Sequence, residues 1–342
     1  MPITPATPIP PERLMQFAFG FAPPLIIEAA IRHQVFNALD GGPKTVDTLS
    51  AETRTSPRGL GAILNALVGL DFLAKDDQGR YALTPESAMF LVSGKPAFHG
   101  AFFLLTSEAM LSQWRKLPEI VRSGHPGQQI NREQDGVGFF SRFVEDIFPM
   151  HYPAAQRLGE ALGVARARAP VSVLDLAAGS GVWSVALAQQ SPHVRVTAID
   201  WAGVIPITRK VTERLAIADR FRFVEGDLAE ADFGSGYAIA TMGHILHSEG
   251  EQRSRLLLKK TFVALAPGGT IAIAEILVDE SRTGPLPALI FAVNMLVNSD
   301  QGDTFSLGEI SEWLRSAGFE AVRTVDAPGL APRLIVATKS NR

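Results

Sequence analysis

The chain has 342 residues, a net charge of −3 and no cysteine. The length fits one large domain or two ordinary ones, and the lack of cysteine excludes disulfides, thiolate nucleophiles and thiolate-bound metals. The small net charge gives no sign of a polyanionic partner, and the apolar runs are too short to cross a bilayer. We therefore expect a cytoplasmic protein with neither a nucleic-acid nor a membrane partner.

Residues 1–100 predict helices followed by a short hairpin. An apolar helix is predicted over 14–31, kinked or split by Pro23 and Pro24. A second apolar helix covers 57–70, with proline at its first position. Two short apolar segments then flank a turn signal at 76–79. This order is typical of a winged-helix module.

The charges of this module favour a dimer contact over DNA binding. Residues 1–100 carry eight Lys or Arg and nine Asp or Glu, a net charge of −1, whereas DNA readers carry a basic face. The helix over 57–70 has Arg58 as its only charge, and helices this apolar are usually buried. We predict a homodimer formed through residues 1–100, with a winged-helix regulator as the less favoured alternative.

Residues 101–165 are apolar and aromatic, and they predict a helical linker that borders a substrate pocket. Helices are expected over 98–111, 114–121, 139–148 and 153–163, with a loop over 124–138. Core packing is the simpler interpretation of the aromatic side chains here. Lining of an aromatic substrate pocket is the alternative, for which the candidates include Phe139, Phe143, Met150, Phe291 and Met295.

Residues 166–342 alternate strands with helices. Strands are predicted over 171–176, 194–199, 221–224, 237–241, 270–277, 321–325 and 333–337. Helices are predicted between them over 182–190, 205–218, 251–265 and 307–317. The alternation predicts an α/β fold with a Rossmann-like, doubly wound sheet, whose ligands bind at the carboxyl ends of the strands.

A glycine-rich turn follows the first of these strands. Such a turn brings backbone N–H groups close to a nucleotide or a carboxylate. A dinucleotide fold would place a third glycine where Ser184 stands, so the spacing argues against that cofactor. The pattern is instead D-x-A-x-G-x-G, formed by Asp175, Ala177, Gly179 and Gly181. A backbone contact tolerates Ala177 if its φ is negative.

Acidic residues end the next two strands. Asp200 can accept both hydroxyls of a ribose, and Trp201 beside it can lie on an adenine ring. Asp227 can accept an adenine amino proton. A helix-cap or turn role is the simpler interpretation of either Asp alone. Because both acids are in register with the glycine turn, together they indicate an adenosine site.

With its winged helix, the chain resembles the plant caffeate/flavonoid-type and bacterial polyketide-type small-molecule O-methyltransferases, class I enzymes that use S-adenosyl-L-methionine (SAM). The resemblance rests on VLDLAAGSGVW, GDL at 226–228, the segment 243–260, LAPGGTIAIAE at 265–275 and SAGF at 316–319. It implies that S-adenosyl-L-homocysteine is the product and that no metal takes part. It places SAM contacts at the backbone near Ala177 and at Asp200, Asp227, Leu228 and Gly243, the last being Lys in plant members.

The resemblance also implies the catalytic residues. His247 matches the general base of the family, and Ser248-Glu249 stands where the family has Asp-Trp. Glu275, at the end of a strand, matches the acid that orients the base. A second acid is expected near Asp303, with Thr304 as the neighbouring alternative. Without the resemblance, a capping or buried structural histidine is an equally good interpretation of His247.

These residues predict methyl transfer from SAM to a hydroxyl of an aromatic or polyketide-like small molecule. A positioned histidine is a suitable base for a phenol, and a carboxylate on its other ring nitrogen fixes the tautomer. The Ser248-Glu249 pair leaves two alternatives open. One is methylation of N, C or S, and the other is a SAM-binding relative that catalyses a non-methylating reaction.

Overall fold

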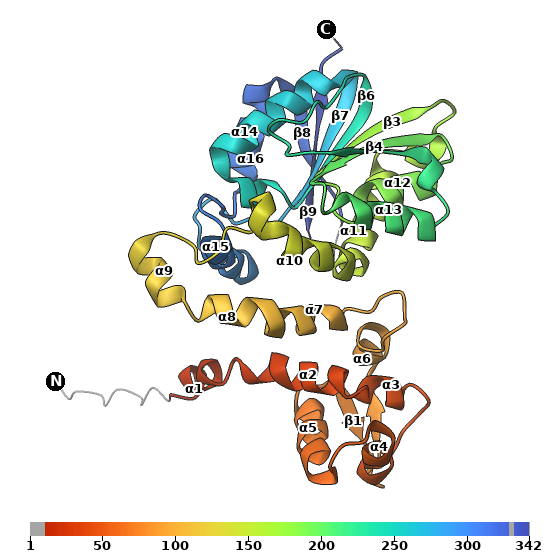
Figure 1. The fold of residues 1–342 in the computed structure, drawn as a ribbon, viewed down its shortest axis with the longest axis vertical. Coiled ribbons are helices and arrows are strands. Elements are labelled where there is room, and N and C mark those ends of the chain that lie inside the picture. Colours follow the sequence, from red (N-terminus) through yellow and green to blue (C-terminus); the bar gives the residue numbers. More distant parts are fainter. Residues whose placement is uncertain (1–10, 328–331, 342) are drawn as a thin grey trace, which may run out of the picture. The chain divides into compact units, whose positions relative to one another are not determined.

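The computed structural model describes residues 11–327 and 332–341. The chain forms two compact units that divide between Glu108 and Ala109 (Figure 1). The predicted division into 1–100, 101–165 and 166–342 stays a prediction. Each unit has buried apolar clusters of its own, so each is described by itself.

Short helices and a hairpin build the N-terminal unit, in the predicted order. Its elements are α1 (Glu12–Ala18), α2 (Ala22–Arg32), α3 (Val35–Leu39), α4 (Val46–Thr53), α5 (Pro57–Gly69), β1 (Leu73–Lys75), β2 (Tyr81–Leu83), α6 (Pro85–Phe90) and α7 (Gly100–Leu105). The predicted break in the first helix falls earlier than Pro23 and Pro24. These prolines lie in the first turn of α2, where a missing N–H leaves no helical bond unmade.

The core of this unit is built from its helices and the hairpin. Val35, Phe36 and Leu64 are fully buried, and Leu73 of β1 lies opposite Leu83 of β2 in an antiparallel pair. Within the described residues no single helix is long and apolar enough to cross a membrane; only α1 and α2 taken together, bent by 41°, pass that test of length and composition.

The described part of the C-terminal unit contains a seven-stranded sheet. The strands are β3 (Val171–Leu176), β4 (Val194–Asp200), β5 (Phe221–Glu225), β6 (Tyr237–Gly243), β7 (Leu265–Glu275), β8 (Phe319–Val325) and β9 (Arg333–Lys339). Their order is β5-β4-β3-β6-β7-β9-β8, and only the pairs made by β9 are antiparallel. The chain leaves β3 toward β4 on one side and later returns to β6 on the other. The carboxyl end of β3 is therefore the switch point at which such sheets bind ligands.

Helices cover both faces of this sheet, which confirms the doubly wound α/β fold. One face carries α11 (Phe148–Ala161), α12 (Val182–Gln190) and α13 (Ile205–Arg214), and the other carries α14 (Leu246–Ala264) and α16 (Leu307–Ala317) (Figure 1). Alternate residues of β3 serve the two faces: Leu174 joins the core beneath α14 and α16, whereas Val173 joins the core beneath α12 and α13.

The remaining helices of this unit differ from the prediction at several points. They are α8 (Leu111–Trp114), α9 (Leu117–Ser123), α10 (Glu133–Asp146) and α15 (Leu286–Asn298), and the last had no predicted counterpart. The predicted loop over 124–138 is wrong from Glu133 onward. The predicted start of a helix at Pro153 is also wrong, because α11 begins at Phe148 and holds Pro153 inside it. A proline near a helix start removes one hydrogen bond, and packing of α11 on α12 outweighs that loss.

Candidate active site

The ring of His247 is held by a buried carboxylate. His247 lies at the start of α14, just beyond β6, and Glu275 ends the neighbouring strand β7. Nδ1 of His247 lies 2.8 Å from Oε2 of Glu275. His247 is 8% exposed and Glu275 is 2% exposed. If Nδ1 carries the hydrogen that this carboxylate accepts, Nε2 keeps the lone pair that can receive a proton.

The same carboxylate also fixes the start of α14. Oε1 of Glu275 accepts the backbone N–H groups of Leu246, at 2.9 Å, and of His247, at 3.3 Å. Amides in the first turn of a helix have no helical partner, and a carboxylate there is a favourable acceptor. The strand end therefore sets both the position of the helix and the direction of the imidazole.

The carboxylate of Asp303 is bound by groups other than the imidazole of His247. The backbone N–H of Asp303 donates to the carbonyl of His247 at 2.9 Å. Its Oδ2 accepts from Arg282 at 3.0 Å, and its Oδ1 accepts the N–H of Thr304 at 2.8 Å. Thr304, the neighbouring alternative, is fully buried, and its Oγ1 has no hydrogen-bond partner within the described residues. Glu275 is thus the predicted acid that the structure brings to the ring.

Asp175 anchors the glycine-rich turn from inside the sheet. Its carboxylate is fully buried and accepts hydrogen bonds from Thr241 Oγ1, at 2.7 Å, and from Ser184 Oγ. Burial raises the pKa of Asp175 to about 6, although both hydroxyls oppose that shift. Ser184 had entered the prediction only as a missing glycine. Its hydroxyl in fact ties α12 to β3.

The condition under which Ala177 would be tolerated without strain, a negative φ, is not met. The φ of Ala177 is +53°, in the left-handed region, where the Cβ of an L-residue crowds the following carbonyl. Gly181 closes the turn in the same region, with a φ of +75° directly before α12. The loop therefore keeps a left-handed turn at a position where the resembling family has glycine, and Ala177 carries the strain of that conformation.

Asp200 connects the end of β4 to the glycine turn. Its Oδ2 accepts the N–H of Gly179 at 2.7 Å, and its Oδ1 accepts the N–H of Trp201 at 2.7 Å. Burial raises the pKa of Asp200 to about 6 against the effect of these two bonds. Each carboxylate oxygen retains a further lone pair for a ligand hydroxyl. Trp201 packs edge-on against Phe140, with ring centroids 5.9 Å apart.

Asp227 is bound by an arginine that the sequence reasoning did not single out. Nη2 of Arg253 lies 2.6 and 2.8 Å from the two Asp227 oxygens. Burial alone would raise the pKa of Asp227, but the N–H of Ala229 and the Arg253 guanidinium hold it below its ordinary value. Arg253 also pairs with the buried Glu249, which replaces the Trp of the resembling family. The i,i+4 spacing of Glu249 and Arg253 was the available signal.

Leu228 and Gly243 were both predicted to contact SAM, and both have close neighbours within the protein. The Leu228 side chain lies in the core beneath α14, and its carbonyl accepts from Lys260 Nζ at 2.7 Å. Gly243 ends β6, and a Cβ atom built on it would overlap the indole of Trp183. Trp183 is 3% exposed. Its ring thus occupies the space into which a lysine at position 243 would extend.

Two more imidazoles and a phenyl ring lie near His247. The rings of His151 and His244 are 4.2 Å apart between centroids, and those of His244 and His247 are 5.9 Å apart. Burial, with the nearby His151 and His247, lowers the pKa of His244 well below its ordinary value. Phe291 of α15 meets the His247 ring edge-on at 4.9 Å. Of the candidate wall residues, Phe291 is thus in contact with the His247 ring.

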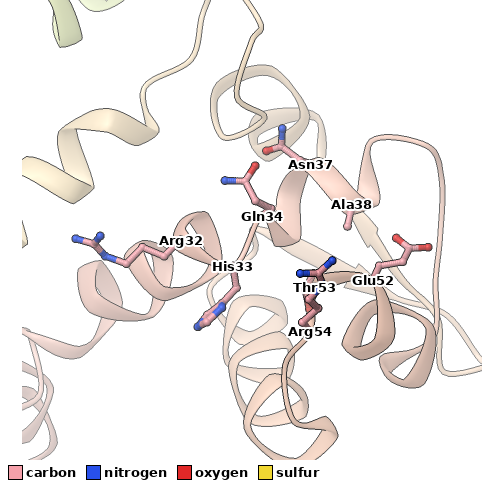
Figure 2. A pocket seen from close by; sticks show the side chains of 8 residues that line it. All are labelled: Arg32, His33, Gln34, Asn37, Ala38, Glu52, Thr53 and Arg54. Atoms are coloured by element: carbon pink, nitrogen blue, oxygen red, sulfur yellow. The ribbon is translucent and has the colours of Figure 1, made fainter.

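A separate pocket in the N-terminal unit holds none of these residues. It is lined by side chains from α2, α3 and α4, which include Arg32, Asn37 and Glu52 (Figure 2). The guanidinium of Arg32 is already engaged by Glu28 and Glu108, each at 2.7 Å. The pocket also has a second guanidinium, that of Arg54, and the residues that line it include none of the predicted site residues.

Comparisons with known proteins match both units. A family model described as the O-methyltransferase domain matches residues 159–320, and one described as the O-methyltransferase dimerisation domain matches residues 15–93. The 3-hydroxy-5-methyl-1-naphthoate 3-O-methyltransferase of Streptomyces sahachiroi is 30% identical over 332 residues, 94% of this chain and 93% of that one. The tetracenomycin polyketide synthesis 8-O-methyl transferase TcmO of Streptomyces glaucescens is 27% identical over 331 residues, 93% and 94% of the two chains. The crystal structure of human N-acetylserotonin methyltransferase in complex with SAM shares the fold, with a TM-score of 0.83 and 22% identity over 99% of this chain and 100% of that one.

Proposed function

The chain belongs to the O-methyltransferase family, and from that premise we propose that it methylates a hydroxyl of an aromatic or polyketide-like small molecule, with His247 as the general base. It is a SAM-dependent methyltransferase, and S-adenosyl-L-homocysteine is the product of the transfer. The single observation that carries the proposed mechanism is the contact of 2.8 Å between His247 Nδ1 and Glu275 Oε2. The substrate class follows the two Streptomyces relatives, whose names describe a naphthoate and a polyketide acceptor.

The SAM subsite is proposed at the carboxyl ends of β3, β4 and β5. The backbone of the turn from Ala177 to Gly181 faces the start of α12, which suits the carboxylate of the methionine portion. Asp200 accepts the ribose hydroxyls while it holds Gly179 in place. Trp201 and Asp227 border the adenine. Arg253 contacts both oxygens of Asp227. Asp227 can therefore accept the adenine amino proton only from the position in which this arginine holds it.

Proton removal is assigned to the His247 ring. Nε2 takes the proton of the acceptor hydroxyl while Nδ1–H stays directed at Glu275. The acceptor oxygen attacks the methyl carbon in line with the sulfonium, and the carbon–sulfur electron pair returns to sulfur. Glu275 stabilises the imidazolium that forms. The rest of the barrier is lowered by proximity and alignment of oxygen, methyl and sulfur.

We also propose that the protein acts as a homodimer in the cytoplasm. Its N-terminal unit matches a dimerisation domain. Several large apolar side chains on and just after α1 are strongly exposed, among them Leu14 at 72%, Phe17 at 69% and Phe19 at 62%. Exposed apolar surface of this extent is typical of a protein interface. A monomeric mass in light scattering at micromolar concentration would contradict the dimer.

The proposed activity is tested with SAM labelled in its methyl group and a panel of phenols and hydroxylated polyketides. Label transferred to an acceptor oxygen supports the proposal. Label on nitrogen, carbon or sulfur would contradict O-methylation and show that the protein methylates that atom instead. His247→Ala should reduce the turnover number by about 10²–10⁴-fold, the usual contribution of a general base, with binding of S-adenosyl-L-homocysteine retained. The exposed His193 gives the matched control, His193→Ala. An undiminished rate in His247→Ala would remove the base assignment.

A further inference from the structure

Three potential metal ligands converge at the carboxyl ends of β6 and β7. One ring nitrogen each from His244 and His247 and one carboxylate oxygen of Glu275 all lie within 4.8 Å of one another. Two imidazoles and one carboxylate are the protein ligands of a common class of zinc site, in which a fourth position stays open for water. The chain contains no cysteine that could compete for such an ion.

The backbone forces His244 into this cluster. β6 and β7 are adjacent parallel strands, so their carboxyl ends, Gly243 and Glu275, lie side by side. His244 directly follows Gly243 with a φ of +59°, a left-handed conformation that costs an L-residue free energy. Nε2 of His244 is buried and has no hydrogen-bond partner within the described residues. An unpaired buried nitrogen in a strained residue lacks a partner that a metal ion would supply.

We propose that His244, His247 and Glu275 form an inhibitory site for a divalent transition-metal ion of the Zn²⁺ class. Its inhibitory role rests on the proposed function, because it assumes that His247 is the base, whereas metal binding itself does not. Zn²⁺ holds nitrogen and oxygen ligands at about 2.0–2.2 Å, which places tetrahedral ligand atoms about 3.4 Å apart. His247 and Glu275 are already close enough, at 2.8 Å. The His244 nitrogen lies within 4.8 Å of both other ligand atoms, so the His244 ring must move toward them to complete the set.

Coordination removes the basic lone pair of His247, whichever nitrogen binds the ion. A neutral imidazole has one N–H and one lone pair. If Nε2 binds the metal, the lone pair that faces the acceptor is used. If Nδ1 binds it, the ring hydrogen must sit on Nε2, and again no lone pair faces the acceptor. Glu275 is withdrawn from the base in both cases, so the bound ion switches off proton removal.

Metal binding is measured first, without any acceptor. Wild-type protein, stripped with a chelator, is titrated with Zn²⁺ in a calorimeter and against a chromophoric chelator. We expect one high-affinity ion per chain. His244→Asn is the informative variant, because asparagine tolerates a left-handed φ and lacks the imidazole. It should lose at least about tenfold in affinity, since even residues that only support a ligand contribute about 10–100-fold.

The matched control is His193→Asn, which removes an exposed histidine and should leave the affinity unchanged. Equal affinities for wild type and His244→Asn would overturn the site. Retained binding of S-adenosyl-L-homocysteine shows that the variant is folded. Co²⁺ bound to the wild type provides a test without any variant: intense visible bands of a four-coordinate ion support the site, and the weak spectrum of hydrated Co²⁺ overturns it.

Inhibition is measured as methyl transfer at increasing Zn²⁺ concentration. We expect the wild-type rate to fall and to recover on addition of chelator, with half-inhibition shifted by the same factor as the affinity in His244→Asn. Zn²⁺ binding that leaves the rate unchanged overturns the inhibitory role. No transfer by metal-free wild type would instead count against the proposed function, and the calorimetric result would still decide the metal site.

Discussion

Glu275 Oε2 lies 2.8 Å from Nδ1 of His247, while Oε1 of the same carboxylate accepts two backbone N–H groups at the start of α14. One side chain at the end of β7 thus aligns both the helix and the ring that it carries. Since strand β7 is paired with β6 on one side and with β9 on the other, the direction of the imidazole is set by an interior strand of the sheet. Loss of the carboxylate should therefore affect the chemical step more than cofactor binding.

Glu275→Gln should lower the turnover number by about 10²–10⁴-fold while the KM for SAM changes less than about twofold. The amide can still accept the backbone N–H of Leu246, but its NH₂ group faces Nδ1. This favours the tautomer with hydrogen on Nε2, which has no lone pair for the acceptor proton. Steady-state kinetics with both substrates varied measure the effect. Glu251→Gln, on the exposed side of α14, is the control, and a loss confined to the KM for SAM would contradict the prediction.

Cofactor affinity should rise with pH through the titration of Asp200. Its pKa in the free protein is raised to about 6, and ribose hydroxyls donate to the ionised form. Binding of S-adenosyl-L-homocysteine should therefore strengthen between pH 5 and pH 7 and level off above. Calorimetry at several pH values tests this, with Asp200→Asn expected to show weaker and flatter binding. The exposed Asp219 gives the control variant Asp219→Asn, which should follow the wild type.

The free energy of unfolding should also depend on pH, through the buried Asp175. It should fall as pH rises, whereas the cofactor affinity rises. The folded pKa of Asp175, about 6, lies above its ordinary value of 3.8, so the folded state binds more protons in this range. The free energy of unfolding then falls as pH rises from about 4 to 6, by about 3 kcal/mol at most. Asp175→Asn should lack this decline. Urea unfolding of both proteins at each pH gives the difference, and parallel curves would contradict the raised pKa.

Ala177→Gly should stabilise the protein by about 1 kcal/mol, because glycine adopts a φ of +53° without steric cost. The neighbouring Ala178 is the control. It is 3% exposed and packs in the core, so Ala178→Gly should destabilise through lost packing and added chain entropy. Urea midpoints with unchanged slopes report both effects. A destabilised Ala177→Gly variant would show that the alanine methyl contributes more than its strained backbone costs.

Substitutions at Gly243 and Trp183 should have strongly non-additive effects on the free energy of unfolding. Gly243→Ala places a methyl group in the volume of the indole and should cost about 1–3 kcal/mol by overpacking. In a Trp183→Phe background the smaller ring leaves room, so the same change should cost much less. A double-mutant cycle by urea unfolding measures the coupling. Costs that add within about 0.5 kcal/mol would indicate independent sites and contradict the packing argument.

Local patterns were sufficient for the strands of the C-terminal sheet and for several candidate site residues at their ends, but not for α15 or for the start of α10. Alternating apolar runs predicted the strands, and the strand ends then placed Asp200, Asp227 and Glu275 along one edge of the sheet. This works because parallel strands share a direction, so their carboxyl ends meet. Periodicity was less informative where a proline lies inside a helix. The start of α11 was therefore missed, since packing against α12 outweighs one lost hydrogen bond.

The sequence by itself determined the strands of the C-terminal sheet and the glycine turn, and its resemblance to a known family indicated the pairing of a histidine with an acid at neighbouring strand ends. Only the tertiary structure decided which groups those side chains meet. Asp303 pairs with Arg282 rather than with the base, Trp183 fills the space above Gly243, and His244 turns toward His247. These outcomes depend on rotamers and on backbone φ values within a packed interior. Contacts between residues distant in sequence set both, and no local pattern records such contacts.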